Sequence, residues 1–259
     1  MSLFIDIHCH LDHPKFDDLG KVIENAKKAG LKIILTNGIN PETNRKTLEI
    51  AKKYDIVKAA LGIYPVNQLV KEIKEGNYPI KIEKFDVDEE IKFIKKNKNK
   101  ITAIGECGLD GLDKESIKEQ KIVFGKLISL AEKINKPIIV HSRKAEQDVI
   151  DMLESSRAKV LLHCFSGRKH LVKKAAELGY YFSIPTNVVR AQNFQLMAEI
   201  VNINQLFCET DAPYLSPFKD RRNEPMFIVE AYKKIAEIKG MELEEVMNNI
   251  FLNYQKVFK

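Results

Sequence analysis

Two histidines near the start of the chain have the spacing of a metal-binding pair. His8 and His10 follow a short apolar, β-branched run at residues 4–7. Side chains two residues apart on a strand point to the same side, so we expect both imidazoles to project toward one point. Neutral imidazoles presented in this way can bind a divalent metal ion. A His-x-His pair is common by chance, so this interpretation depends on partners elsewhere in the chain.

Further candidate ligands occur where other short apolar runs end. These residues are Glu106, His141, His163, Glu209 and Asp211. Four of the six histidines thus lie at such ends, which scattered surface histidines would rarely do. Together with Glu106 and Asp211, the four imidazoles are too many ligands for one tetrahedral ion, and a central Glu106 can bridge two. Two ions can clamp the attacking and leaving oxygens of an ester or amide and acidify a bound water, and phosphodiesters are natural substrates.

The sequence shows no sign of a side-chain nucleophile. Ser142 and Ser166 lie beside candidate histidines, but neither belongs to a Gly-x-Ser-x-Gly turn. The chain also has no P-loop and no Gly-x-Gly-x-x-Gly motif. The predicted chemistry is therefore hydrolysis by a metal-activated water.

Strand-like and helix-like segments alternate about eight times along the chain. The predicted strands are residues 3–7, 32–36, 56–61, 101–105, 137–140, 159–162, 180–184 and 206–208. The predicted helices are residues 19–29, 41–53, 88–96, 115–134, 144–154, 170–178, 193–201, 227–238 and 242–258. This alternation predicts a parallel (β/α)8 TIM barrel, with an open doubly wound sheet as the alternative. Active sites of such barrels lie where the carboxyl ends of the strands converge. Residues 65–86 are predicted to form a loop excursion.

Composition limits the class of protein. The 259 residues contain no linker-like stretch, so residues 1–259 are predicted to form one domain. No apolar run approaches the ~18 residues of a membrane span, and we see no secretory signal. The four cysteines lie in apolar, strand-like segments, which favours reduced, buried thiols and a cytoplasmic protein. A net charge of +6 permits a polyanionic partner without requiring one.

The candidate residues fall within blocks that resemble those of the TatD family of metal-dependent deoxyribonucleases, which is amidohydrolase-like. The blocks are HCH at 8–10, IGECGLD at 104–110, HSR at 141–143, HCFSG at 163–167 and ETDAPYL at 209–215, and RNEP at 222–225 also matches. They occur in the family's order and span most of the chain. The resemblance implies an amidohydrolase-like barrel with a divalent metal site.

The resemblance also implies roles for the candidate ligands. One ion would be held by His8, His10, Glu106 and Asp211, and a second by Glu106, His141 and His163. Glu106 takes the place that a carboxylated lysine occupies in related barrels. Asp211 would bind metal and accept the proton of the attacking water, so Asp211 and Glu106 are the predicted catalytic residues. The ions would be Mg²⁺, Mn²⁺ or Zn²⁺.

The substrate side is less defined. Arg143 and Arg222 are candidates for phosphate contact, with a surface ion pair as the alternative for each. Many family members carry Gly-x-His-Pro-His after the third strand, but here residues 62–66 read GIYPV. Tyr64 is predicted to donate a hydrogen bond to a substrate phosphate. Asp6 is expected either to bond a ligand imidazole or to be a satisfied buried carboxylate.

Three functions compete at this stage. The leading hypothesis is a cytoplasmic deoxyribonuclease of 3′–5′ exonuclease type that acts on single strands or 3′ ends, without a membrane partner. A barrel of this size can stand alone as a monomer. The alternative is a D-aminoacyl-tRNA deacylase, or another small ester or amide hydrolase, on the same site. The third is a non-catalytic nucleic-acid-binding or scaffold protein on a barrel frame. The intact ligand set counts against it, because a retired site has no physical need for six metal-binding side chains.

Overall fold

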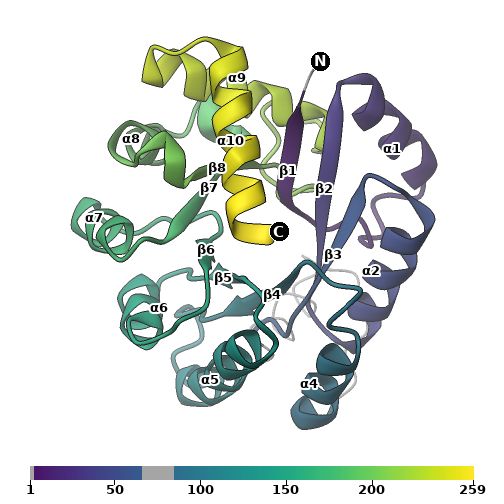
Figure 1. Cartoon of the computed structure of the whole chain (residues 1–259), viewed down its shortest axis with the longest axis vertical. Coiled ribbons are helices and arrows are strands. Elements are labelled where there is room, and N and C mark those ends of the chain that lie inside the picture. Colours follow the sequence, from purple (N-terminus) through teal and green to yellow (C-terminus); the bar gives the residue numbers. More distant parts are fainter. Residues whose placement is uncertain (1–2, 66–84) are drawn as a thin grey trace.

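The computed structural model describes residues 3–65 and 85–259 of the chain, and shows eight parallel strands in one sheet (Figure 1). The strands pair in chain order: β1 (Phe4–Cys9), β2 (Leu31–Gly38), β3 (Val57–Leu61), β4 (Ala103–Gly108), β5 (Ile138–His141), β6 (Val160–Leu162), β7 (Tyr181–Pro185) and β8 (Leu206–Glu209). The first and last strands meet through the amide of Asp211, which donates to the carbonyl of His8 at 2.9 Å. The amide of His10 donates in turn to the carbonyl of Ala212 at 2.8 Å. The predicted (β/α)8 barrel is confirmed.

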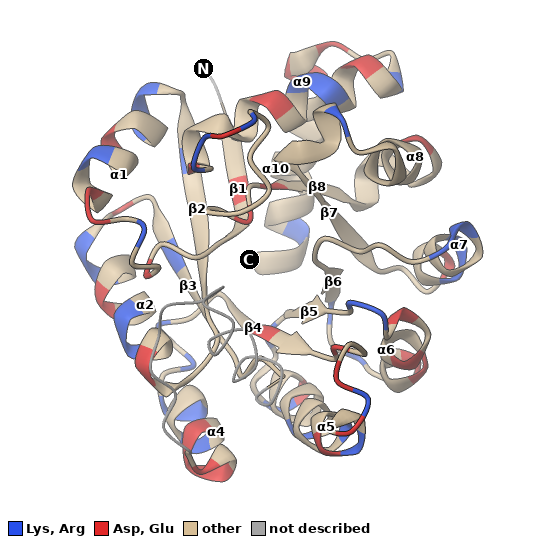
Figure 2. Cartoon of the chain, turned by 180° about the vertical axis from the view of Figure 1, so that it is seen from behind, with Lys and Arg blue, Asp and Glu red and all other residues tan. Residues whose placement is uncertain are grey.

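The helices of the described residues lie around the outside of this barrel, except the last, which crosses one end. They are α1 (Leu19–Lys28), α2 (Pro41–Lys53), α4 (Val87–Lys96), α5 (Ile117–Ile134), α6 (Glu146–Leu153), α7 (Lys169–Glu177), α8 (Gln192–Ile200), α9 (Ile228–Lys239) and α10 (Leu243–Phe258). Figure 2 shows charged residues mainly on these helices and on the loops, with a red segment on β4 inside the barrel. That segment is Glu106, the acidic residue of β4.

Local sequence explains where the helices begin. Asn40 caps α2 by accepting the amide of Thr43, while Thr43 returns a hydrogen bond to the backbone of Asn40, and Pro41 starts the helix with a preset φ angle. Asp86 caps α4 by accepting the amides of residues 88 and 89. The strands are buried on both faces. Every residue of β1 and of β4 is buried. This is the pattern of a parallel sheet covered by helices.

The last helix closes one end of the barrel. Asn253 in α10 donates to the carbonyl of Leu206, the first residue of β8, at 2.9 Å. Phe258 packs edge-on against Phe207 of the same strand. The helix α10 therefore covers the end of the barrel at which β8 begins. The polar side chains gather at the opposite end, where the strands finish.

Several strands are longer than predicted at their carboxyl ends. His8 lies within β1, Glu106 within β4, His141 within β5 and Glu209 within β8, although all were expected to follow their strands. The backbone keeps pairing beyond the last apolar residue, as the register of Gly108 with His141 shows. Polar side chains here point into the barrel mouth, so the apolar pattern ends before the strand does. The predicted excursion at residues 65–86 lies almost entirely outside the described residues.

Within the described part of the chain, no helix combines the length and the apolar character that crossing a membrane requires. All four cysteines are free thiols.

Candidate metal centre

Glu106 lies at the centre of the polar cluster in the barrel mouth. Its Oε2 is 3.4 Å from Nε2 of His8 and 3.4 Å from Nε2 of His10. Its Oε1 is 3.1 Å from Nδ1 of His141 and 3.3 Å from Nε2 of His163. Each carboxylate oxygen therefore faces two imidazoles, and the four histidines named in the sequence meet around one side chain.

Asp211 completes the side of the cluster that faces β1. Its Oδ1 is 3.6 Å from Nε2 of His8 and 3.4 Å from Nε2 of His10. The residue has φ = 53°, a left-handed conformation that non-glycine residues adopt rarely and that is enriched at functional sites. The hydrogen bond from its backbone amide to the carbonyl of His8 holds this segment against β1.

The six predicted ligands form two adjoining groups. The potential ligand atoms of His8, His10 and Asp211 lie within 4.8 Å of one another, and so do those of Glu106, His141 and His163. Imidazole nitrogens and carboxylate oxygens gathered at this spacing suit Zn²⁺, Mn²⁺ or a similar divalent ion. The donor set in this structure therefore fits the metal centre predicted from the sequence.

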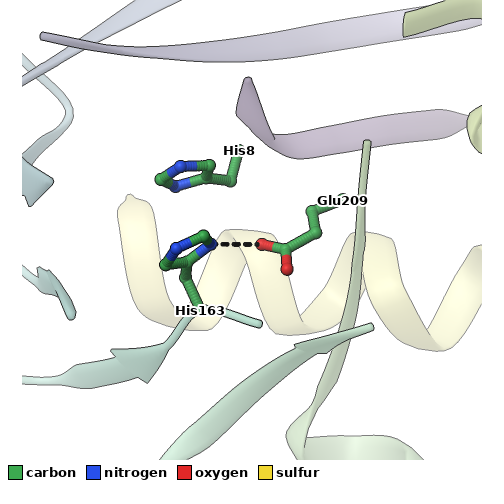
Figure 3. A group of neighbouring side chains, drawn as sticks. All are labelled: His8, His163 and Glu209. Carbon is green, nitrogen blue, oxygen red and sulfur yellow. Dashed lines mark hydrogen bonds and ion pairs between the residues drawn. The ribbon is translucent and has the colours of Figure 1, made fainter. Parts of the chain in front are cut away.

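Outer hydrogen bonds orient three of the histidines. Nδ1 of His10 lies 3.1 Å from the carbonyl oxygen of Asn37. Nε2 of His141 lies 3.0 Å from Oδ2 of Asp110, and Nδ1 of His163 lies 3.3 Å from Oε2 of Glu209 (Figure 3). A ring nitrogen that donates to such an acceptor leaves the opposite nitrogen with its lone pair toward the centre.

Asp110 connects the metal centre to the predicted substrate side. This fully buried carboxylate accepts a hydrogen bond from Nε of Arg143 at 2.6 Å as well as from His141, and the Tyr64 hydroxyl lies 3.5 Å from the same oxygen. Gln120 fixes the backbone of Asp110 by accepting its amide and donating to its carbonyl. Asp110 belongs to the IGECGLD block, but its residue type alone predicted no role there. Its place four residues after Glu106 is the signal in the sequence that points to it.

The two carboxylates of the centre keep their charge. Burial raises the pKa of Glu106, but the imidazoles of His163 and His141 outweigh burial and hold that pKa well below its usual range. The pKa of Asp211 is also lowered, because hydrogen bonding to His10 and the nearby imidazoles exceed the effect of burial. Burial opposes a proton on His10, yet its hydrogen bond to Asp211 and the charge of Glu106 raise its pKa to about 9. Protonated imidazoles beside ionised carboxylates mark a place where a cation can replace the protons.

Asp6 was expected either to bond a ligand imidazole or to be a satisfied buried carboxylate, and the structure shows the second. Its oxygens accept the amide of Thr210 at 2.9 Å, the Thr210 hydroxyl at 2.6 Å and the amide of His8 at 3.4 Å. Burial raises the pKa of Asp6 to about 8. The carboxylate therefore ties β1 to the segment that carries Asp211, and its described contacts include no imidazole.

Arg222 lies in an ion-pair network. Its guanidinium donates to both carboxylate oxygens of Asp18 at 2.9 and 3.1 Å and to Glu224 at 2.9 Å. It also donates to the carbonyl of Lys15 and lies over the ring of Phe16. The structure thus shows the ion-pair alternative for this residue, and phosphate contact by Arg222 stays a prediction.

The sequence profile of the family described as "TatD related DNase" matches residues 5–259. The chain belongs to this family. An uncharacterised metal-dependent hydrolase of Methanocaldococcus jannaschii is 36% identical to it, over 99% of this chain and 97% of the relative. Human deoxyribonuclease TATDN3 is 35% identical over 98% of this chain and 94% of its own length. The crystal structure of the TatD homologue YjjV of Escherichia coli superposes with a TM-score of 0.85 at 24% identity, over 98% of this chain and 97% of that one. That likeness shows the shared fold, and the TatD family assignment agrees with the resemblance stated from the motifs.

Proposed function

We propose that this TatD-family protein is a metal-dependent hydrolase that cleaves DNA phosphodiester bonds, with single-stranded DNA or 3′ ends as substrate. The observation that carries the proposal is the position of Glu106, whose Oε2 faces two imidazoles from the end of β1 and whose Oε1 faces one imidazole from β5 and one from the end of β6. Family membership and the printed name of the human relative, a deoxyribonuclease, support DNA as the substrate.

Two divalent ions are proposed as cofactors. His8, His10, Glu106 and Asp211 would hold one, and Glu106, His141 and His163 the other. When bound, such a pair acidifies a water molecule and neutralises charge on a phosphate. The imidazole-rich donor set favours Zn²⁺ or Mn²⁺ over Mg²⁺, which prefers oxygen ligands.

Asp211 is proposed to accept the proton of the attacking water. Its lowered pKa keeps the carboxylate ionised near neutral pH, as a proton acceptor must be. Its side chain is 15% exposed, against 4% for Glu106, so it is the carboxylate of the centre that solvent reaches more readily. Oδ1 faces His8 and His10 and would bind the ion, so Oδ2 is the atom expected to receive the proton.

Arg143 and Tyr64 are proposed to position the substrate. Arg143 is held through Nε by Asp110, and its side chain is 40% exposed. The Tyr64 hydroxyl lies 3.3 Å from Nε2 of His141 and is buried at the edge of the centre. A guanidinium fork and a hydroxyl donor on one side of the centre suit the oxygens of a phosphate.

The test is hydrolysis of a 3′-labelled single-stranded oligonucleotide by metal-stripped protein supplied with Mg²⁺, Mn²⁺ or Zn²⁺. Glu106→Gln should abolish cleavage. Glu90→Gln is the matched control, because Glu90 is an equally buried carboxylate that pairs with Arg45 outside the centre. Stepwise shortening that depends on metal and on Glu106 supports the proposal. An oligonucleotide that stays intact with every ion, or equal activity of the two variants, contradicts it.

A second candidate function is hydrolysis of a carboxyl ester, such as a D-aminoacyl-tRNA, or of another small ester or amide. The observation that favours it is Tyr64, which stands beside His141 where many family members have histidine. A phenol cannot shuttle protons near neutral pH as an imidazole can. Deacylation and nucleolysis rates measured on one preparation separate the two functions.

We also propose that the protein works in the cytoplasm. The four cysteines are free, and Cys9, Cys107 and Cys208 are buried, which fits a reducing compartment.

A further inference from the structure

Glu209, the last residue of β8, is a fully buried carboxylate that the proposed chemistry does not use. Its Oε2 accepts a hydrogen bond from the Ser183 hydroxyl at 2.6 Å and lies 3.3 Å from Nδ1 of His163 (Figure 3). Its Oε1 has no hydrogen-bond partner among the described residues. A buried acceptor without a donor costs about 1–3 kcal/mol, so this oxygen calls for an explanation.

His8 supplies the matching unsatisfied atom. Its Nδ1 is buried and likewise lacks a partner in the part of the chain that the structure describes. The His8 ring stacks on the ring of His163, with centroids 3.9 Å apart and planes inclined by 15° (Figure 3). One nitrogen from each ring and one oxygen of Glu209 lie within 4.8 Å of one another.

The chemistry of imidazole ligands connects these atoms. Nε2 of His8 and Nε2 of His163 both face Glu106, at 3.4 and 3.3 Å. An imidazole that binds a metal through Nε2 carries its proton on Nδ1 and donates it to an acceptor. Oε2 of Glu209 already faces Nδ1 of His163, and Nδ1 of His8 and Oε1 of Glu209 are the two atoms of this group that lack a partner among the described residues.

We propose that Glu209 is a positioning residue shared by His8 and His163, and that it couples the assembly of the two halves of the metal centre. The inference rests on the proposed metal-dependent function and adds a residue that acts on both ions. His8 belongs to the group with His10 and Asp211, whereas His163 belongs to the group with Glu106 and His141. Removing the charge of Glu209 therefore weakens both ions together.

Metal binding by Glu209→Gln tests the proposal. The variant keeps the shape of the side chain but has a single acceptor oxygen for two imidazole donors. Co²⁺ is titrated against a competing chelator and followed by visible absorption, with elemental analysis for stoichiometry. We expect both ions to bind about 10–100-fold more weakly than in the wild type. Ser183→Ala, which removes the other hydrogen bond to Glu209 and leaves its charge, should bind both ions within a few-fold of wild type.

Two results overturn the proposal: unchanged affinity for both ions in folded Glu209→Gln, and weakening of the His163 ion alone. The second would make Glu209 the partner of His163 only. A wild-type chain that binds no ion refutes the metal centre itself, so the two failures are distinguishable.

A measurement on the wild type keeps the proposal testable if Glu209→Gln does not fold. Nitrogen-15 NMR of the histidine side chains in Zn²⁺-loaded protein should show slowly exchanging protons on Nδ1 of both His8 and His163. An unprotonated Nδ1 on His8, or a proton there that exchanges freely with solvent, overturns the shared role.

Discussion

Gly62 offers a way to move Glu106 without changing any polar side chain. The residue follows β3 and packs against the backbone of β4. A Cβ atom added at Gly62 would lie 2.6 Å from the carbonyl carbon of Gly105 and 2.7 Å from that of Glu106, and would also meet the carbonyl oxygen of Glu106. Glycine therefore permits the close approach that sets the height of Glu106 in the barrel.

The size of the perturbation follows from these distances. Ordinary van der Waals contact begins at 3.4 Å, so Gly62→Ala forces the two backbones apart by at least about 0.8 Å, and by more at the carbonyl oxygen of Glu106, which is nearer still. Glu106 makes its four imidazole contacts at 3.1–3.4 Å, and a shift of that size disturbs all of them. Overpacking costs about 1–3 kcal/mol in the free energy of unfolding, and a misplacement near 1 Å lowers catalytic rates about 100-fold.

The assay compares Gly62→Ala with Gly125→Ala. Gly125 lies in α5, where the nearest atom to an added Cβ is the methyl carbon of Met152 at 4.0 Å, so alanine should stabilise the helix by up to about 1 kcal/mol. Urea unfolding, metal affinity and phosphodiester hydrolysis are measured for both variants. Gly62→Ala with wild-type metal affinity and rate would refute the claim that this backbone contact positions Glu106.

Three further predictions follow from the geometry. Removing the ions with a chelator should lower the melting temperature by about 5–10 °C for each ion bound at 100 times its Kd. The reason is that the ligands come from strands far apart in sequence and meet only in the folded chain, so the ions bind the folded state alone. In the same thermal melts, Glu106→Gln should show a much smaller shift on chelation. Burial, with a smaller effect from Glu154, raises the pKa of Tyr180 from 10.0 to about 12, so the native state keeps a proton that the unfolded chain loses and stability falls as pH rises from 10 to 12. Tyr180→Phe should flatten that fall, measured by urea unfolding between pH 9 and 12. It should not lower the free energy of unfolding at pH 7, because the hydroxyl has no partner among the described residues. Arg143→Lys should raise the KM for DNA about tenfold, because lysine lacks the guanidinium fork that Asp110 holds in place. Arg222→Lys should mainly lower the free energy of unfolding, by about 1 kcal/mol. Equal changes in KM for the two variants in steady-state kinetics would contradict this distinction.

The strand boundaries show where sequence patterns stop being informative. The order and type of the elements were predictable, because buried parallel strands read as apolar runs and helices as amphipathic segments. The carboxyl ends of β1, β4, β5 and β8 were predicted too short, because pairing continues through the polar residues that point into the mouth. The predicted loop at residues 65–86 stays a prediction for its undescribed part.

The candidate site divides in the same way. The residue types and spacing of His8, His10, Glu106, His141, His163 and Asp211 were enough to predict a set of metal ligands, because few other chemistries use four imidazoles with two carboxylates at strand ends, and the structure brings these six side chains together. Only the tertiary structure shows that Glu106 stands between the two groups, that Asp110 joins His141 to Arg143, and that Asp18 and Glu224 hold Arg222. The physical reason is that a side chain's type and its place on a strand are local properties. Its partners depend on which strands the closed barrel brings together, as β1 and the segment after β8 are brought together here.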